Sequence, residues 1–223
     1  MTVLFVLMIF AAFLALDAWS HRREAALEPI AVRVAEPESL AYEPVWVGGY
    51  QVPDGFHFHR GHTWVRPLDA ETAVVGIDDF ARRLIGRATR AEMPQPGEWV
   101  ATGARAAALG HDERDATLVS PVEGQVVEVN PLLESDPGVA TRDPYGRGWL
   151  FKVRTSELGR NLRNLFSGSL AHRLVEDSRE RLHRELMALS GSVLADGGEP
   201  SVDYPAHLSD EEWRRLADEF LIG

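Results

Sequence analysis

Short runs of β-branched and aromatic residues, separated by Gly, Pro and Asp, dominate the middle of this chain. Apolar and polar positions alternate most clearly in residues 125–129 (QVVEV), and such alternation is typical of a half-buried strand. Further strands are predicted at residues 45–47, 63–65, 73–77, 118–119 and 149–153. Many short strands of this kind predict a mainly β fold, either a small sandwich or a flattened barrel.

A helix is expected to interrupt these strands. Phe80, Leu84 and Ile85 share one face at helical spacing, and Asp78 or Asp79 can cap the helix N-terminus. The β region is therefore predicted to contain one embedded helix.

Beyond residue 155 the spacing of apolar residues becomes helical. Residues 156–166 are a candidate helix, and residues 169–189 form an amphipathic helix with apolar positions Leu170, Leu174, Leu182, Leu186 and Leu189. In the last helix Ser209 and Glu212 can form a capping box before the apolar stripe Trp213, Leu216, Ala217, Phe220 and Leu221. Two interpretations stay open. The stripes pack on the core of this chain, or they offer Trp213 and Phe220 as anchors to another subunit.

The N-terminal run, residues 2–16, contains no charge, and its apolar character resumes after Asp17. A helix of about 17–25 residues spans a bilayer, so we predict one transmembrane helix within residues 1–20 that contacts lipid through residues 2–19. The basic residues at 21–23 follow directly, and the positive-inside rule places the N-terminus outside and the soluble part in the cytoplasm. We expect a single-pass protein of a bacterial-type inner membrane.

These patterns divide the chain into four segments. They are the transmembrane helix at 1–20, a Pro- and Glu-rich linker at 21–44, the β domain at 45–155 and a C-terminal helical extension at 156–223.

Composition excludes several classes of function. The 34 acidic residues outnumber the 23 basic ones, giving a net charge of −11, so we expect no nucleic-acid partner. The chain contains no cysteine, which excludes thiolate nucleophiles and iron–sulfur clusters. It has neither a G-x-S-x-G motif nor a Gly-rich phosphate loop. We therefore expect no catalytic residues and no cofactor.

Four segments between residues 75 and 153 carry a resemblance to a known family. They read GIDDFARRLIG (76–86), AEMPQPGEWV (91–100), SPVEGQVVEVN (120–130) and DPYGRGWLFKV (143–153). Together they resemble the lipoyl-carrier core of the glycine cleavage system H protein. The resemblance implies a lipoyl-domain-like fold and carriage rather than catalysis.

The same resemblance implies a lipoylated lysine on a hairpin just before the SP-x-x-G segment. Counting back from Ser120, the matching position is Glu113. A lipoyl amide needs a primary amine, which a carboxylate cannot replace. The only lysine in the chain is Lys152, which lies in a predicted strand beside a tryptophan, so we expect it not to be lipoylated. The chain resembles a carrier without its arm.

The predicted hairpin turn is strongly charged. Asp112, Glu113 and Asp115 surround Arg114. Such a turn is either a solvated loop or a docking tip, and in the second case Asp112, Glu113 and Arg114 are the candidates for contact with a partner of complementary charge.

We expect no metal site, and the histidines His57, His59 and His62 are the candidate ligands if one exists. On a strand, His57 and His59 would point to the same face, and a third ligand nearby could complete a zinc site. Against this, His62 begins a His-x-Trp stretch that the resembling family also carries, which gives it a structural explanation.

Three hypotheses of function follow. The first is a non-catalytic, membrane-anchored docking subunit at the cytoplasmic face of an integral membrane protein complex, such as a respiratory or photosynthetic electron-transfer complex. The second is a small-ligand or metal-binding module that uses the histidines. The third is a remnant carrier in one-carbon or sulfur metabolism, against which the missing lysine argues.

Overall fold

A computed structural model describes residues 42–189 and 204–222. The strands within this part of the chain are β1 (Trp46–Val47), β2 (Tyr50–Gln51), β3 (His57–Phe58), β4 (Thr63–Pro67), β5 (Thr72–Ile77), β6 (Arg90–Glu92), β7 (Trp99–Val100), β8 (Arg105–His111), β9 (Arg114–Val119), β10 (Gly124–Val129) and β11 (Phe151–Arg154). All the predicted strands are present, with shifted ends, and the fold is mainly β with several helices, as expected.

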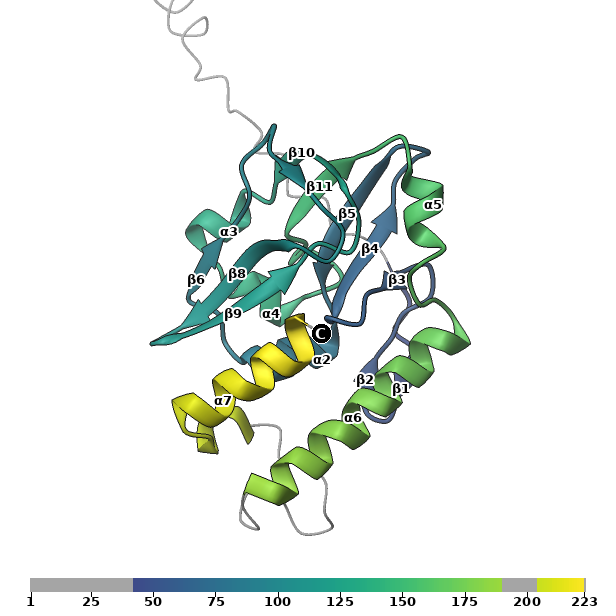
Figure 1. The fold of residues 1–223 in the computed structure, drawn as a ribbon. Coiled ribbons are helices and arrows are strands. Elements are labelled where there is room, and N and C mark those ends of the chain that lie inside the picture. Colours follow the sequence, from purple (N-terminus) through teal and green to yellow (C-terminus); the bar gives the residue numbers. More distant parts are fainter. Residues whose placement is uncertain (1–41, 190–203, 223) are drawn as a thin grey trace, which may run out of the picture. The chain divides into compact units, whose positions relative to one another are not determined.

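Every strand pair is antiparallel. The largest sheet has the order β3-β4-β5-β11-β10-β7, a second sheet has the order β6-β8-β9, and β1 pairs with β2. Figure 1 shows the β6-β8-β9 sheet beside the larger sheet. Apolar side chains from both sheets, among them Val75, Val126, Leu109 and Leu118, belong to one continuous core.

The embedded helix is α2 (Asp79–Ile85), and it begins as the sequence predicts. The Asp78 carboxylate accepts a hydrogen bond from the Ala81 amide at 2.8 Å, which identifies Asp78 as the N-cap residue. Phe80, Leu84 and Ile85 are buried against the core. Just before it, Gly76 leaves room for the Trp64 ring, which a Cβ atom at this position would strike. This contact explains the first residue of the GID motif.

Two further helices in the same region have no counterpart among the predicted elements. They are α3 (Leu132–Ser135) and α4 (Val139–Arg142), which lie between β10 and β11. Each has four residues and no side-chain cap. Helices this short carry too little periodicity to be recognised in a sequence.

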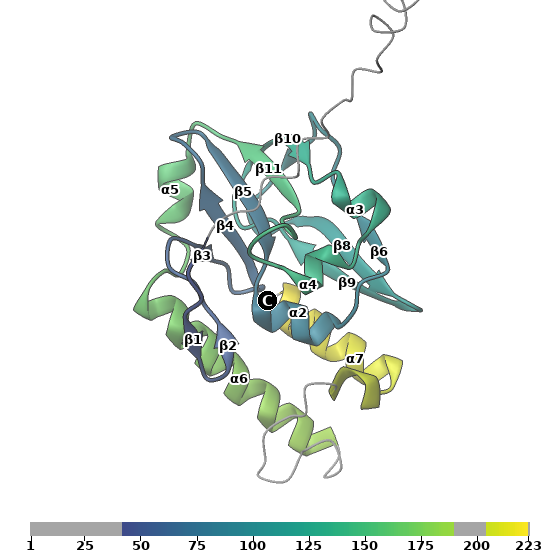
Figure 2. The same ribbon diagram turned by 180° about the vertical axis from the view of Figure 1, so that it is seen from behind.

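The C-terminal part contains α5 (Leu158–Leu162), α6 (Ser169–Leu189), a 3-10 turn η1 (Tyr204–His207), α7 (Asp210–Ala217) and the π-helical end η2 (Asp218–Ile222). Figure 2 shows α6 running past α2 and the β1–β2 hairpin. The capping box of Ser209 and Glu212 is present. The buried face of α6 is Ala171, Val175, Ser178, Leu182 and Leu186, whereas Leu170 is 54% exposed. The prediction that Leu170 belongs to that face is wrong, because a pattern of leucines overlooks the smaller residues that pack there.

The described residues, 42–189 and 204–222, belong to one compact unit, and the C-terminal helices share its core. Among residues 42–189 and 204–222, the structure contains no helix with the length and hydropathy that a membrane span requires. The predicted transmembrane helix at 1–20 and nearly all of the linker at 21–44 lie outside these segments.

Candidate functional site

The hairpin between β8 and β9 places Glu113 at its tip. Because His111 pairs with Arg114, only Asp112 and Glu113 form the turn. Two-residue hairpin turns need a positive φ, and Asp112 supplies it with a φ of 51°. The side chains of Asp112 and Glu113 are exposed. The position at which the family resemblance leads one to expect a lipoyl-lysine is therefore presented to solvent, and it carries a carboxylate.

Arg90 on the neighbouring strand holds this turn. Its Nη1 donates to the Asp112 carbonyl, and its Nη2 lies 2.7 Å from an Asp115 carboxylate oxygen. The hydrogen bond to Asp115 is the largest cause of the raised pKa of Arg90. On the other side, His111 Nε2 lies 3.3 Å from Asp112 Oδ2. Two of the acidic residues around the tip are thus engaged within the sheet.

Arg114 is turned toward the C-terminal segment. Its Nη1 donates to the Pro205 carbonyl at 2.7 Å and its Nη2 to the Leu208 carbonyl at 2.6 Å. Its Nε donates to Asp210 Oδ1 at 2.7 Å. Arg114, a predicted candidate for partner contact, therefore has its guanidinium engaged by this chain's own carbonyls and by Asp210.

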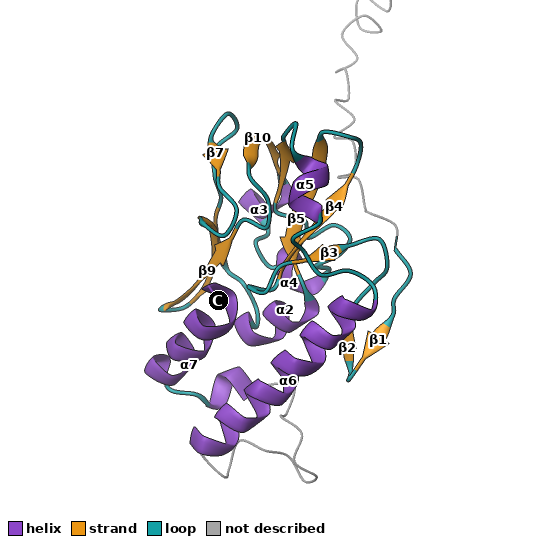
Figure 3. Ribbon diagram, turned by 45° about the vertical axis from the view of Figure 1, so that its right-hand side comes forward, coloured by secondary structure: helices purple, strands orange, loops and turns teal. Residues whose placement is uncertain are grey.

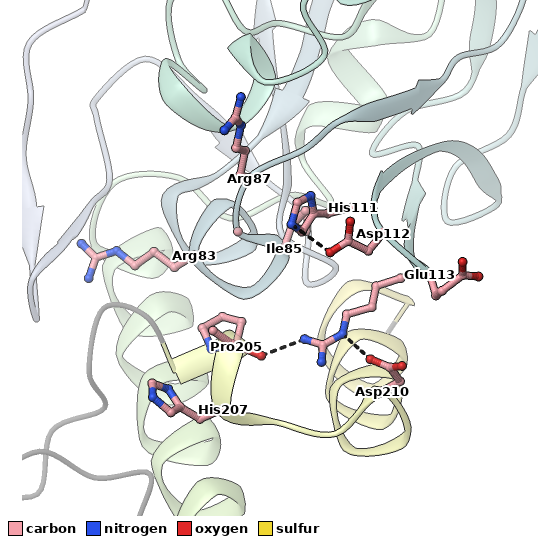
Figure 4. Close-up of a pocket in the computed structure, with 12 residues that line it drawn as sticks. Arg83, Ile85, Arg87, His111, Asp112, Glu113, Pro205, His207 and Asp210 are labelled. Atoms are coloured by element: carbon pink, nitrogen blue, oxygen red, sulfur yellow. Dashed lines mark hydrogen bonds and ion pairs between the residues drawn. The ribbon is translucent and has the colours of Figure 1, made fainter.

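A cavity of about 770 Å³ lies between the hairpin tip and the C-terminal segment. Its walls come from the end of α2 with the residues after it, from the hairpin, and from η1 with the start of α7. Figure 4 shows Glu113 and Asp112 at the hairpin end, opposite Pro205 and Asp210, while Arg83 and Arg87 extend away from these acidic side chains. The cationic groups do not converge, so the cavity is not built as an anion site.

Lys152 lies in β11, as predicted, and far in the sequence from the hairpin tip. Its Nζ is 2.9 Å from Glu128 Oε2 on the paired strand and 5.0 Å from the centre of the Trp149 ring. Only 19% of its side chain is exposed. Because its amine is held in an ion pair on a regular strand, Lys152 does not have the mobile, exposed amine that a lipoyl carrier needs.

The three histidines do not form a metal site. The strand β3 ends at Phe58, so His57 and His59 do not share a strand face. His62 is fully buried, with Nδ1 2.7 Å from Asp78 Oδ2 and Nε2 2.9 Å from Ser178 Oγ. Both of its ring nitrogens are occupied. The interpretation of His57, His59 and His62 as ligands of one metal is wrong, and no other group of three ligand residues fits a metal ion within 42–189 and 204–222.

His62, Asp78 and Ser178 have the contacts of an Asp–His–Ser triad. Their exposed fractions are 0%, 1% and 4%, so no substrate reaches the serine hydroxyl. The His62 ring also stacks on Phe80 with 4.1 Å between ring centres. The cluster joins α6 to the β domain through satisfied polar groups. Sequence analysis missed the partnership because Ser178 lies 116 residues from His62.

Trp213 and Phe220 are not anchors for another subunit. Each is 2% exposed. Trp213 Nε1 donates to the Leu84 carbonyl at 2.8 Å, and the Phe220 and Phe80 rings are 5.2 Å apart. The structure therefore supports the alternative interpretation, in which Trp213 and Phe220 pack on the core of this chain, and not the one in which they contact another subunit.

Comparisons with known proteins identify relatives of this chain. The family profile named glycine cleavage H-protein matches residues 56–178. The glycine cleavage system H protein of Marinobacter nauticus is 37% identical over 110 residues, which are 49% of this chain and 84% of that protein. A probable glycine cleavage system H protein of Thermococcus gammatolerans is 32% identical over 130 residues, 58% of this chain and 96% of that protein.

A glycine cleavage system H protein from Mycobacterium marinum is among the similar solved structures, with 27% identity and a TM-score of 0.48, covering 54% of this chain and 95% of that one.

Proposed function

This chain belongs to the glycine cleavage H-protein family, whose members are lipoyl carriers without catalytic activity of their own, and we propose that it is a member that does not carry lipoate. The observation that supports this proposal is the residue at the hairpin tip. Glu113 occupies the solvent-exposed position at which the carrier resemblance places a lysine. A carboxylate cannot form the lipoyl amide, because the bond needs an amine nitrogen.

Lys152 does not replace the missing amine. It is the only lysine of the chain, and its ammonium group is held by Glu128 on a regular strand pair. An enzyme that attaches lipoate would have to break this ion pair and reach a side chain that is 19% exposed. A lysine on an exposed hairpin turn has no such ion pair to break, and its amine is already accessible to the enzyme.

Intact-mass spectrometry tests the proposal. The full chain is produced in cells with an active lipoylation pathway and added lipoate, beside the Marinobacter nauticus H protein as a positive control. We expect the control to gain a lipoyl group and this chain to retain its unmodified mass. A lipoyl group on Lys152, located by peptide mapping, would refute the proposal.

The role left to such a protein is structural. In this proposal the family domain is a docking module held at a membrane by the apolar run at residues 2–19, with a membrane protein complex as partner. Its support is the uncharged stretch at residues 2–16 with basic residues at 21–23, and the exposed acidic turn of Asp112 and Glu113. The specific partner that we propose is a respiratory or photosynthetic electron-transfer complex. This choice follows from the exclusion of catalytic, nucleic-acid-binding and cofactor-binding roles, and no single residue indicates it.

Membrane fractionation of the full chain separates the parts of this role. The unaltered protein should stay with membranes after an alkaline wash, and a variant with arginine in the apolar run, Phe10→Arg, should be released, since a charge in the membrane interior costs about 2.5–3.5 kcal/mol. Purification in mild detergent should then retain integral membrane proteins. Elution of this chain alone as a monomer would contradict the docking role.

A further inference from the structure

Residues 204–222 lie beyond the part of the chain that matches the family profile, and they cover the hairpin. In the order β6-β8-β9 the strand β9 is an edge, and an uncovered edge leaves backbone groups open to other chains. Figure 3 shows α7 and the chain end lying along this side of the β9 strand. The segment therefore closes the edge nearest the hairpin tip.

The polar part of this cover is centred on Arg114, the residue directly after Glu113. Its guanidinium makes three contacts with the segment, to the carbonyls of Pro205 and Leu208 and to the Asp210 carboxylate. Charge-assisted hydrogen bonds of this kind are about twice as strong as neutral ones. Arg114, the residue that directly follows the turn, thus links the turn to residues 204–222.

The apolar part is a row of buried side chains. Trp213, Leu216, Phe220 and Leu221 are each at most 2% exposed. Trp213 reaches the end of α2 through its bond to the Leu84 carbonyl, and the Arg114 guanidinium lies 5.6 Å from the Trp213 ring centre. Ion pairs Arg181–Glu219 and Arg215–Glu185 fix the same segment to α6. Residues 204–222 are therefore fixed to the hairpin, to the end of α2 and to α6.

We propose that residues 204–222 are a built-in cover on the flank of the hairpin that keeps lipoate-attaching enzymes from engaging it, while the exposed tip stays open to the docking partner. This inference rests on the proposed function and extends it: the hairpin has lost its lysine, and its flank is also occupied. Glu113 itself remains open to small molecules, because its side chain is exposed. The proposed cover therefore acts on the flank of the hairpin at Arg114 and not on the tip itself.

The test restores the lysine and then loosens the cover. Glu113→Lys is made alone, with Arg114→Ala, and with Arg105→Ala as a matched control that removes an exposed arginine elsewhere on the same hairpin. Each full-length variant is incubated with a lipoate–protein ligase, ATP and lipoate. The ligase first joins the lipoate carboxylate to ATP as lipoyl-AMP and releases pyrophosphate. The lysine amine then attacks the lipoyl carbonyl carbon, displaces AMP and loses a proton, which leaves the amide. A small amine-reactive ester, read by peptide mapping, reports separately how exposed the introduced lysine is.

We expect the ester to label position 113 equally in all three variants. The ligase should modify the Arg114→Ala variant roughly tenfold faster than the single variant, since loss of charged hydrogen bonds worth about 1.4 kcal/mol opens the cover tenfold more often. The Arg105→Ala control should match the single variant. Circular dichroism checks that each variant is folded, and Asp210→Ala, which removes only the carboxylate contact, replaces Arg114→Ala if that variant unfolds.

Three outcomes overturn the cover. One is modification of the Glu113→Lys variant at the rate of the Marinobacter nauticus carrier. Another is an equal rate with and without the Arg114 contacts. The third is a dimer in solution whose hairpin is covered by the segment of a second copy. Lipoylation of the unaltered chain would instead refute the proposed function and leave the cover standing, so the two failures are distinguishable.

Discussion

Two polar clusters in this protein differ in every property that matters for chemistry. The cluster of His62, Asp78 and Ser178 has the contacts of a catalytic triad and is buried. The hairpin tip of Asp112 and Glu113 is exposed to solvent and carries carboxylates but no amine. The buried cluster therefore contains potentially reactive groups that no substrate reaches. The hairpin tip is accessible but lacks the amine that a lipoyl carrier needs.

If the chain carries no lipoate, as we propose, this difference illustrates how a carrier fold can lose its chemistry and keep its structure. The buried cluster contributes to packing, because Asp78 caps α2 with one carboxylate oxygen and accepts from His62 with the other. The tip makes few contacts that the fold needs. Substitutions in the buried cluster should therefore lower the free energy of unfolding far more than substitutions at the tip.

The largest loss of stability is expected for Trp213→Ala. The side chain is 2% exposed and hydrogen-bonded to the Leu84 carbonyl, so its removal should lower the free energy of unfolding by about 3–5 kcal/mol. Urea unfolding measures this loss. Trp99→Ala is the matched control, because Trp99 is 63% exposed and should cost less than about 1 kcal/mol. Equal losses would mean that the C-terminal segment does not pack on this core.

His62→Ala is expected to lower the free energy of unfolding by about 2–4 kcal/mol, because it leaves Asp78 and Ser178 with buried polar groups that have lost a partner. Ser178→Ala should cost about 1 kcal/mol. A double-mutant cycle by urea unfolding should show that the two losses are not additive. Additive losses would contradict a direct link between α6 and the β domain.

Stability should also depend on pH through His59. Burial first, then the charges of Arg60 and His62, lowers the pKa of His59 from 6.5 to about 4. The unfolded chain therefore binds a proton that the folded chain does not, and stability falls as the pH falls from about 6.5 to about 4. His59 is partly exposed, which reduces the effect to about 1 kcal/mol.

His59→Asn isolates this contribution, since an asparagine can still accept the hydrogen bond that the Gly61 amide donates to His59 Nδ1. The difference in unfolding free energy between the variant and the unaltered protein should change across this pH range. A constant difference would show that His59 titrates normally.

The smallest effect is expected at the tip. Glu113→Gln should change the free energy of unfolding by less than about 0.5 kcal/mol, because the side chain is exposed. A loss comparable to that of His62→Ala would place Glu113 among the residues that hold the fold, and the contrast between the two clusters would disappear.

Much of the fold could be predicted from the sequence because it depends on local signals. The Asp78 cap, the capping box of Ser209 and Glu212, and the limits of α6 all come from residues within a few positions of one another. The position of Glu113 at the hairpin tip came from spacing to the SP-x-x-G segment, and the strand pairing agrees with it.

The site residues were predicted less well, because their partners are distant in the sequence. Arg114 lies 96 residues from Asp210, and His62 lies 116 residues from Ser178. An arginine in an acidic turn predicts a surface charge, and two histidines at alternate positions predict a shared strand face. Neither pattern reveals that the C-terminal segment takes up the arginine or that β3 stops at Phe58.

The central claim is that this member of the family cannot serve as the carrier of glycine cleavage. Glycine-dependent release of CO₂ in a cell extract freed of its own H protein, but retaining lipoylation, tests it most directly. We predict that the Marinobacter nauticus protein restores the release and that this chain, at equal concentration, leaves it at background. Restored release on addition of this chain would contradict the account.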